Sequence, residues 1–217
     1  MSLKLDTNAR CAVIGYGSWA TAIVKILCEN EQRVGWLIGN PIVAEGVINE
    51  EHNPKYLSDA ELDTTKLAIS DDINQVVREA DIIVMATPSA YLKKTLEPLT
   101  ESLDDKFIVS AIKGIIPDEY VTVAEYFNQQ YSIPFGRIGI VTGPCHAEEV
   151  ALEHLSYLTV VCSNTEDAEV LQRKFTTKYI RTVTSSDIYG IEYATVLKNI
   201  YAIAVGIADG LGYGDNF

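Results

Sequence analysis

The chain has few basic residues for its length. Among its 217 residues, 17 are Lys or Arg and 30 are Asp or Glu, so the formal net charge at pH 7 is −13. Binding to the phosphates of nucleic acids or to an anionic membrane requires clustered Lys and Arg, and the sequence has no such cluster. We therefore expect neither partner. Backbone amides and one or two lysines can still bind a small anion.

Cysteine and histidine are also scarce, with four and three residues. The cysteines have no CxxC spacing, and three of them fall in apolar patterns typical of reduced core residues. The histidines lack the spacing of metal ligands, so no metal site is predicted. These residues are Cys11, Cys28, Cys145, Cys162, His52, His146 and His154.

Long uncharged apolar runs are absent as well. Lys198 and Asp209 interrupt the best candidate, and the first ten residues lack the apolar core of a signal peptide. Hydrophobic residues make up 47% of the chain and the mean hydropathy is +0.08, values typical of soluble globular proteins. We expect a cytoplasmic protein with a sizeable core and no membrane insertion.

What the sequence does contain is an alternation of strand and helix patterns, which is typical of a parallel sheet covered by helices. It predicts a mostly parallel, Rossmann-like doubly wound α/β sheet. A longer helix follows near Ser185 and Ser186, where we place a domain boundary between residues 1–185 and 186–217. The expected strands are 11–14, 33–38, 82–86, 107–111, 138–142, 157–162 and 179–184, and the expected helices include 20–30, 71–80, 121–131, 147–153 and 166–175.

A glycine turn joins the first strand to the first helix. Gly15 permits the tight turn, and Gly17 lets the backbone approach a pyrophosphate that the first N–H groups of the helix can bind. Ala20 stands where the dinucleotide-binding fingerprint has its third glycine and still allows close packing of helix on strand. A single GxGxxA motif has frequent false matches, and its place between a strand and a helix supports it here.

Two later loops follow predicted strands, at the edge where parallel sheets bind ligands. In the first, a strand end delivers Lys113 to the ligand crevice, with a solvated loop lysine as the alternative. In the second, Gly143 and Pro144 make a tight turn and the amides from Cys145 onward open a helix that can face an anion. The alternative is an ordinary turn between a strand and a helix.

The last helix carries a lone lysine in an apolar run. At helical periodicity, Ile191, Ala194, Ala202 and Val205 share the face of Lys198, so we expect its ammonium to lie in a setting with little water. Desolvation would lower its pKa toward that of a usable base. The alternative is a lysine that extends out of a core helix into solvent.

Four segments together resemble the bacterial type of NAD(P)-dependent glycerol-3-phosphate dehydrogenase. They are GYGSWATA, SAIKGI, TGPCHAEEV and LKNIYAIAVGIADGLGYGDN, in the family's order and spacing. The resemblance covers nearly the whole chain. It implies a dinucleotide-binding domain over residues 1–185, with residues 186–217 as the first helix of a C-terminal domain for substrate binding and catalysis.

The resemblance also implies roles for individual residues. Lys198 matches the catalytic lysine, which also contacts substrate. Gly15, Gly17, Ser18, Trp19 and Ala147 match positions that bind NAD or NADP, and Lys113 matches a lysine reached by both cofactor and substrate. Gly143 and Cys145 match substrate-contacting positions. The implied reaction interconverts dihydroxyacetone phosphate and sn-glycerol 3-phosphate by hydride transfer, supplying glycerol phosphate for phospholipid synthesis.

Three features depart from the family pattern. Residues 38–41 contain neither the acidic residue typical of NAD sites nor the arginine typical of NADP sites, so the cofactor preference cannot be read, and Asn40 is only a weak candidate for contacting the ribose. Thr195 and Val196 replace small residues. The family also has a full C-terminal helical domain that holds further catalytic residues, so we expect this piece alone to bind dinucleotide weakly, to turn over poorly or not at all, and to expose apolar surface on its last helix.

Other functions remain open at this point. A related 3-hydroxyacid or 6-phosphogluconate dehydrogenase also combines a Rossmann domain with a helical lysine. From another class, the chain could be a non-catalytic dinucleotide-binding module in which Lys198 is a packed core residue. The expected partner is a small phosphate-bearing substrate, with a homodimer as a possible assembly.

Overall fold

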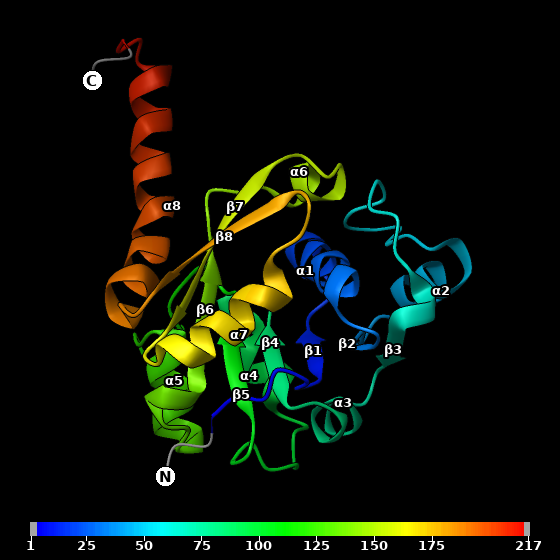
Figure 1. Ribbon diagram of the computed structural model, residues 1–217. Coiled ribbons are helices and arrows are strands. Elements are labelled where there is room, and N and C mark those ends of the chain that lie inside the picture. Colours follow the sequence, from blue (N-terminus) through cyan, green and yellow to red (C-terminus); the bar gives the residue numbers. More distant parts are fainter. Residues whose placement is uncertain (1–3, 215–217) are drawn as a thin grey trace.

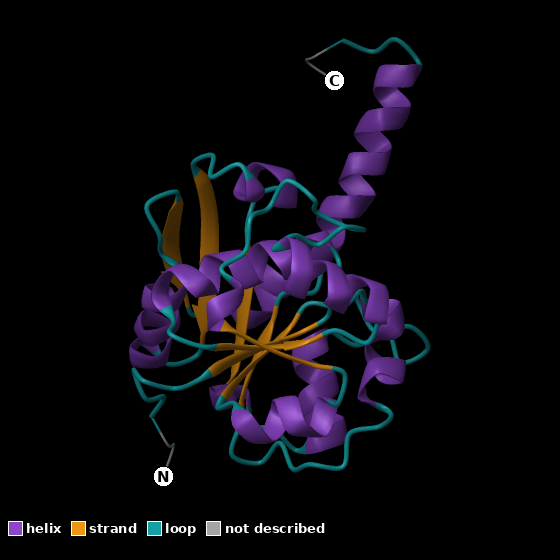
Figure 2. Cartoon of the chain, turned by 90° about the vertical axis from the view of Figure 1, so that its right-hand side faces the viewer, coloured by secondary structure: helices purple, strands orange, loops and turns teal. Residues whose placement is uncertain are grey.

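The structure is a computed structural model that describes residues 4–214. Asp215, Asn216 and Phe217, at the end of the glycine-rich run, lie outside the described residues. One mixed sheet forms the centre, with helices on both faces (Figures 1 and 2). The strands are β1 Cys11–Ile14, β2 Val34–Leu37, β3 Leu67–Ser70, β4 Ile82–Met85, β5 Phe107–Ser110, β6 Ile138–Thr142, β7 Ser156–Cys162 and β8 Ile180–Ser185.

The sheet has the order β3-β2-β1-β4-β5-β6-β7-β8. All neighbouring strands are parallel except β6 and β7, which pair antiparallel. The doubly wound, mostly parallel sheet predicted from the sequence is therefore confirmed. The helices are α1 Ser18–Asn30, α2 Pro41–Glu50, α3 Ile73–Glu79, α4 Ser89–Leu96, α5 Val123–Tyr131, α6 Ala147–Ala151, α7 Thr165–Phe175 and α8 Ile188–Gly210.

Alternate residues of each central strand enter two separate cores. In β1, Cys11 and Val13 face the core formed with α1, α2, α6 and α7, while Ala12 and Ile14 face the core formed with α3, α4 and α5. Both sets are buried because helices cover both faces of the sheet. This explains why β1, β4 and β5 appear in the sequence as continuous apolar runs.

Two elements lie where the sequence pattern predicted none. The edge strand β3 has four residues, each only half-buried, so it shows neither a long apolar run nor clear alternation. The helix α2 contains Gly46, at which a Cβ would meet the ring of Pro54 at 2.5 Å. The glycine permits this close packing and also interrupts the helical sequence pattern.

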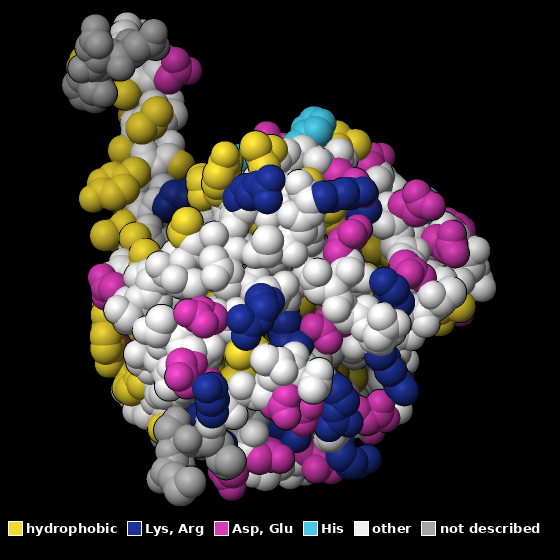
Figure 3. Space-filling view, viewed as in Figure 1, with side chains coloured by type: hydrophobic (Ala, Val, Ile, Leu, Met, Phe, Trp, Pro, Cys, Tyr) yellow, Lys and Arg dark blue, Asp and Glu magenta, His cyan; other side chains and the backbone are white. Residues whose placement is uncertain are grey.

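The last helix, α8, leaves the body of the molecule (Figure 1). Ile188, Glu192 and Thr195 in its first turns are buried, whereas apolar side chains further along, such as Ile203 and Val205, are about two-thirds exposed (65% and 66%). Hydrophobic side chains gather along it in Figure 3. The expectation of exposed apolar surface on this helix is confirmed.

Within residues 4–214, α8 alone is long and apolar enough to cross a membrane by length and composition. A single helix of this kind is weak evidence for a span. It also carries Lys198 near its middle, and a charged residue at the centre of a bilayer is costly. That the protein does not insert into membranes stays a prediction.

Candidate active site

The strand order reverses beside β1, where the next strands along the chain, β2 and then β4, lie on opposite sides. Open parallel sheets bind ligands at the carboxyl ends of the strands at such a point. Gly15 follows β1 with φ +124°, and a Cβ on it would lie 2.7 Å from the carbonyl oxygen of Ala86, which follows β4. Glycine is therefore required here both by its backbone conformation and by the close approach of the two strand ends.

Two side chains hold this turn in place, and sequence analysis singled out neither. The buried indole of Trp36 donates from Nε1 to the Gly15 carbonyl oxygen at 2.7 Å. The fully buried amide of Asn53 donates to the Tyr16 carbonyl oxygen at 2.9 Å and to Thr21 Oγ1 at 2.8 Å. The Asn53-Pro54 dipeptide, a common turn marker, was the available signal, but it does not indicate which segment the asparagine contacts.

The helix α1 begins at the turn with no side-chain cap. Its N-cap is Gly17, with φ −75°, and a Cβ there would have no heavy atom within 4 Å. Open space therefore lies in front of the uncapped N–H groups, as anion binding at a helix N-terminus requires. The Ser18 hydroxyl donates to the Tyr56 carbonyl oxygen at 2.5 Å and so is already engaged with protein.

A cavity of about 640 Å³ extends from this turn along the carboxyl ends of β2, β3 and β4. Its size lies within the range of small-molecule sites. Gly15, Gly17, Gly39 and Asp71 contribute to its wall. The wall also includes Tyr16, Leu37, Tyr56, Asp72, Ile73, Ala86, Thr87, Pro88, Tyr91, Lys94, Thr95 and Pro98.

On the other side of the turn, Trp19 and Lys113 come together. The Lys113 ammonium lies 5.4 Å from the centre of the Trp19 ring, within the range of a cation–π interaction. Burial lowers the pKa of Lys113, and the positive charge of Lys198 lowers it further. The Trp19 Nε1 donor is buried without a hydrogen-bond partner among residues 4–214. Lys113 is thus half-buried, not the fully solvated lysine of the alternative interpretation.

The loop after β6 passes close to β7. A Cβ on Gly143 would overlap the Tyr157 carbonyl oxygen, so this position also requires glycine. Cys145 is buried, and burial raises the pKa of its thiol while Lys113 and Lys198 oppose the shift. A raised thiol pKa disfavours a nucleophilic role. The Ala147 methyl packs in the core.

The prediction that the Lys198 ammonium lies in a setting with little water is wrong for the described residues. Its side chain is exposed, as are Ala194, Ala202 and Val205, and Ile191 is only half-buried. The reason is that α8 leaves the sheet after its first two turns, so its later face has no packing partner within residues 4–214. Periodicity correctly groups these residues on one face but does not say what covers it.

Lys198 nevertheless lies near the other site residues. Its charge acts on both Lys113, after β5, and Cys145, after β6. The start of α8 contacts β6 and β7, which places the helix on this side of the sheet. Trp19 and Lys113 thus lie together beside the glycine turn, and the charge of Lys198 reaches both Lys113 and Cys145.

Residues 10–168 match the family described as NAD-dependent glycerol-3-phosphate dehydrogenase N-terminus, and residues 187–217 match its C-terminus. The chain belongs to the NAD-dependent glycerol-3-phosphate dehydrogenase family. Among relatives named glycerol-3-phosphate dehydrogenase [NAD(P)+], that of Macrococcus caseolyticus is 36% identical over 94% of this chain and 62% of its own length. That of Oceanobacillus iheyensis is 38% identical over 95% of this chain and 60% of its own.

Solved structures of the family share the fold. Plasmodium falciparum glycerol-3-phosphate dehydrogenase superposes with a TM-score of 0.88 at 24% identity, covering 96% of this chain and 61% of that one. The enzyme from Coxiella burnetii gives 0.84 at 24% identity, covering 97% and 64%. The chain thus spans about three-fifths of the length of the curated relatives.

Proposed function

We propose that the protein interconverts dihydroxyacetone phosphate and sn-glycerol 3-phosphate with NAD(P)H, and so supplies glycerol phosphate for phospholipid synthesis. The observation that carries the proposal is the convergence of Trp19, Lys113, Cys145 and Lys198 beside an uncapped glycine turn in a member of this family. This convergence supports the proposal, because two lysines whose charges interact suit a phosphate-bearing substrate next to a bound dinucleotide.

The residues of the turn fit a dinucleotide. The open space at Gly17 and the unsatisfied N–H groups of α1 suit a pyrophosphate, and the cavity beyond them suits an adenosine. Gly15 brings the two strand ends together so that the chain can pass under the pyrophosphate. We assign Ser18 and Ala147 backbone contacts to the cofactor, because the Ser18 hydroxyl and the Ala147 methyl are already engaged with protein.

A bound nicotinamide would supply or accept the hydride. In the direction of reduction, Lys198 donates a proton to the carbonyl oxygen at the central carbon of dihydroxyacetone phosphate, and in oxidation it accepts the proton of the hydroxyl group. Its charge also stabilises the developing alkoxide. Lys113 contacts both cofactor and substrate, and Gly143 and Cys145 contact the substrate through the loop after β6.

The wider organisation follows from the same proposal. Residues 1–185 act as the dinucleotide-binding domain, and residues 186–217 begin the C-terminal domain for substrate binding and catalysis. The exposed apolar face of α8 then packs against the remainder of that domain. We further propose a cytoplasmic homodimer that acts on a small phosphate-bearing substrate and binds no nucleic acid.

Substitution of Lys198 tests the proposal. In the full-length protein, Lys198→Ala should lower kcat by about 100-fold or more, because the variant has no general acid, while the Kd for NADH stays nearly unchanged. Lys178→Ala is the matched control, since Lys178 is exposed and pairs only with Glu153 at 2.9 Å. A Lys198→Ala variant with normal turnover would refute the assignment.

A substrate panel separates the alternatives. Full-length protein is offered dihydroxyacetone phosphate, 3-hydroxy acids and 6-phosphogluconate, each with the matching form of NAD and of NADP. Preferred turnover of a 3-hydroxy acid or of 6-phosphogluconate would select the related dehydrogenases. Nucleotide binding without turnover of any of them would select a non-catalytic binding module.

A further inference from the structure

The carboxyl end of β2 carries no charged side chain. Gly39 follows the strand at the cavity wall, and a Cβ there would meet no heavy atom within 4 Å. The next residue, Asn40, uses its Oδ1 to cap α2, accepting from Ile42 N at 3.0 Å and Val43 N at 3.4 Å. Enzymes that take NADP usually place an arginine in this stretch to hold the 2′-phosphate. Here the stretch offers only a backbone and one amide NH₂ group.

Carboxylates approach the same end of the cavity from β3. The N–H of Ile38 donates to the Ser70 carbonyl oxygen at 3.0 Å, so the ends of β2 and β3 lie side by side, and Asp71 and Asp72 come next. Asp72 caps α3 through Asn74 N at 2.8 Å. Asp71 is exposed and makes no hydrogen bond or ion pair within the described part of the chain, so its charge is not offset by a neighbour.

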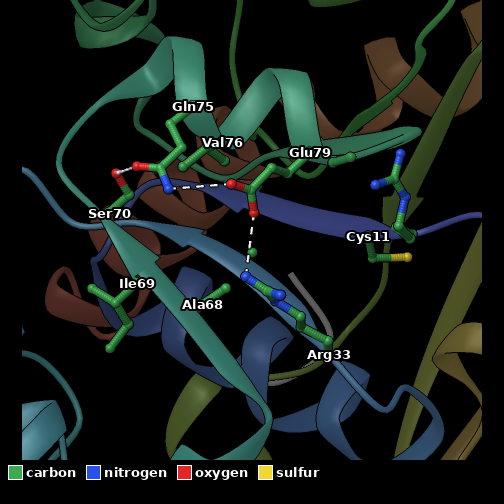
Figure 4. A pocket seen from close by; sticks show the side chains of 11 residues that line it. Cys11, Arg33, Ala68, Ile69, Ser70, Gln75, Val76 and Glu79 are labelled. Carbon is green, nitrogen blue, oxygen red and sulfur yellow. Dashed lines mark hydrogen bonds and ion pairs between the residues drawn. The ribbon is translucent and has the colours of Figure 1, made fainter.

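Few cations within residues 4–214 lie near these charges. The charge of Arg78 acts on Asp72, but Arg78 is itself paired with Glu101 at 2.5 Å. Lys94 is the one cation in the described wall of the cavity, and it comes from α4, which follows β4, three strands away from β3 in the sheet. Arg33 precedes β2 and so lies at the opposite end of the strand, about 13 Å away at the usual rise per residue. It pairs with Glu79 at 3.3 Å beside a separate cavity of about 130 Å³ (Figure 4).

We infer that the cavity selects the dinucleotide with a free 2′-hydroxyl on its adenosine ribose, NAD, over the 2′-phosphorylated form, NADP, and that Asp71 and Gly39 set this preference. The inference rests on the proposed binding of a dinucleotide and deepens it. A 2′-phosphate would bring up to two further negative charges toward Asp71 and Asp72 without an arginine to bind them. A hydroxyl group is neutral and can donate a hydrogen bond to a carboxylate.

The test is direct binding, which does not depend on turnover. The Kd values of NADH and NADPH are measured by fluorescence titration of the full-length protein at one fixed ionic strength. The wild type should bind NADH at least about tenfold more tightly, as expected for one or two unfavourable charge pairs in partly exposed positions. Asp71→Asn should tighten NADPH binding several-fold and leave NADH binding within about twofold.

Two further variants complete the design. Gly39→Arg combined with Asp71→Asn should equalise or reverse the preference, since the arginine side chain has open space at that position. Asp104→Asn removes the same charge before β5, at the amino ends of the strands and so away from the cavity at their carboxyl ends, and should leave the ratio of the two Kd values unchanged. An effect of that control equal to the effect of Asp71→Asn would overturn the local role of Asp71.

The remaining outcomes are also decisive. If the wild type binds NADPH as tightly as NADH, or more tightly, the inferred preference is overturned while dinucleotide binding stands. The Kd of Lys94→Ala for NADPH would then show whether Lys94 binds the 2′-phosphate. Failure to bind either form overturns both the inference and the proposed function. Selective NADH binding in a protein that turns over no substrate upholds the inference and refutes only the proposed reaction.

Discussion

Two glycines only two residues apart should respond differently to the same substitution. At Gly15 an alanine would need φ +124°, and its Cβ would lie 2.7 Å from the Ala86 carbonyl oxygen and 2.8 Å from the carbonyl carbon. At Gly17 the backbone has φ −75°, which any residue adopts, and the Cβ would meet nothing within 4 Å. The first substitution therefore strains the fold, and the second only fills empty space.

The magnitudes follow from these contacts. Gly15→Ala should cost about 2–4 kcal/mol of unfolding free energy, combining an unfavourable backbone conformation with a displaced strand end, which lowers the melting temperature by roughly 4–16 °C. Gly17→Ala should change stability by less than about 1 kcal/mol, because the weaker N-cap preference of alanine is offset by a less flexible unfolded chain.

Ligand binding should separate the two substitutions in the opposite sense. A methyl group at Gly17 occupies the space that we assign to the pyrophosphate, so NADH affinity should fall by about 10–100-fold, equivalent to the loss of one or two charge-assisted hydrogen bonds. Thermal unfolding and NADH titration of wild type, both variants and a Gly136→Ala control supply the data, since a Cβ on Gly136 would also meet nothing within 4 Å and Gly136 does not line the cavity. A Gly17→Ala protein that binds NADH normally would refute the role of the turn, and a normally stable Gly15→Ala protein would refute the strain.

Three further predictions concern residues that support the site and the last helix. Asn53→Ala should destabilise the protein by about 2–3 kcal/mol, because the Tyr16 carbonyl oxygen loses its hydrogen-bond donor. Asn53→Asp should be no more stable, since a carboxylate cannot donate this hydrogen bond. Urea unfolding measures both variants. Trp36→Phe should cost more stability than Trp19→Phe, because only the Trp36 N–H has a partner; equal losses in thermal unfolding would contradict this. Burial raises the pKa of Glu192, so the stability that its protonated form contributes is present at low pH and is lost as pH rises through that pKa. Unfolding of wild type and Glu192→Gln at about pH 5 and pH 8 should therefore show the wild type relatively more stable at the lower pH. A difference in stability that is the same at both pH values would contradict the raised pKa.

The sheet was largely predictable from the sequence because most of its strands are buried on both faces. Runs such as Cys11–Ile14 and Ile82–Met85 have no polar residue, and only a covered strand tolerates that. The edge strand β3 was not predictable, because half-buried residues leave no such pattern. The antiparallel pairing of β6 with β7 was also beyond reach, since strand direction depends on how the chain connects in space.

The site was predictable only where one segment holds all the information. The glycine turn is local, so Gly15 and Gly17 could be assigned from the motif. Asn53 and Trp36 hold that turn from 21 and more residues away along the chain, and no pattern of spacing announces such a contact. For Lys198, periodicity correctly predicted which residues share its face of the helix. It could not predict that this face is exposed within residues 4–214, because exposure depends on what packs against the helix.

The glycine turn with its cavity and the last helix differ in how firmly the rest of the described chain holds them. The cavity lies at the carboxyl ends of strands that are packed into both cores, and the turn beside it is fixed by hydrogen bonds from Trp36 and Asn53. In contrast, within residues 4–214 α8 is anchored only by its first turns, where Glu192 accepts from Ala124 N at 3.2 Å. Binding of the dinucleotide should therefore depend mainly on the glycine turn and the cavity wall, and turnover on how α8 is held. Substitutions in the glycine turn should change Kd, whereas substitutions in α8 should change kcat.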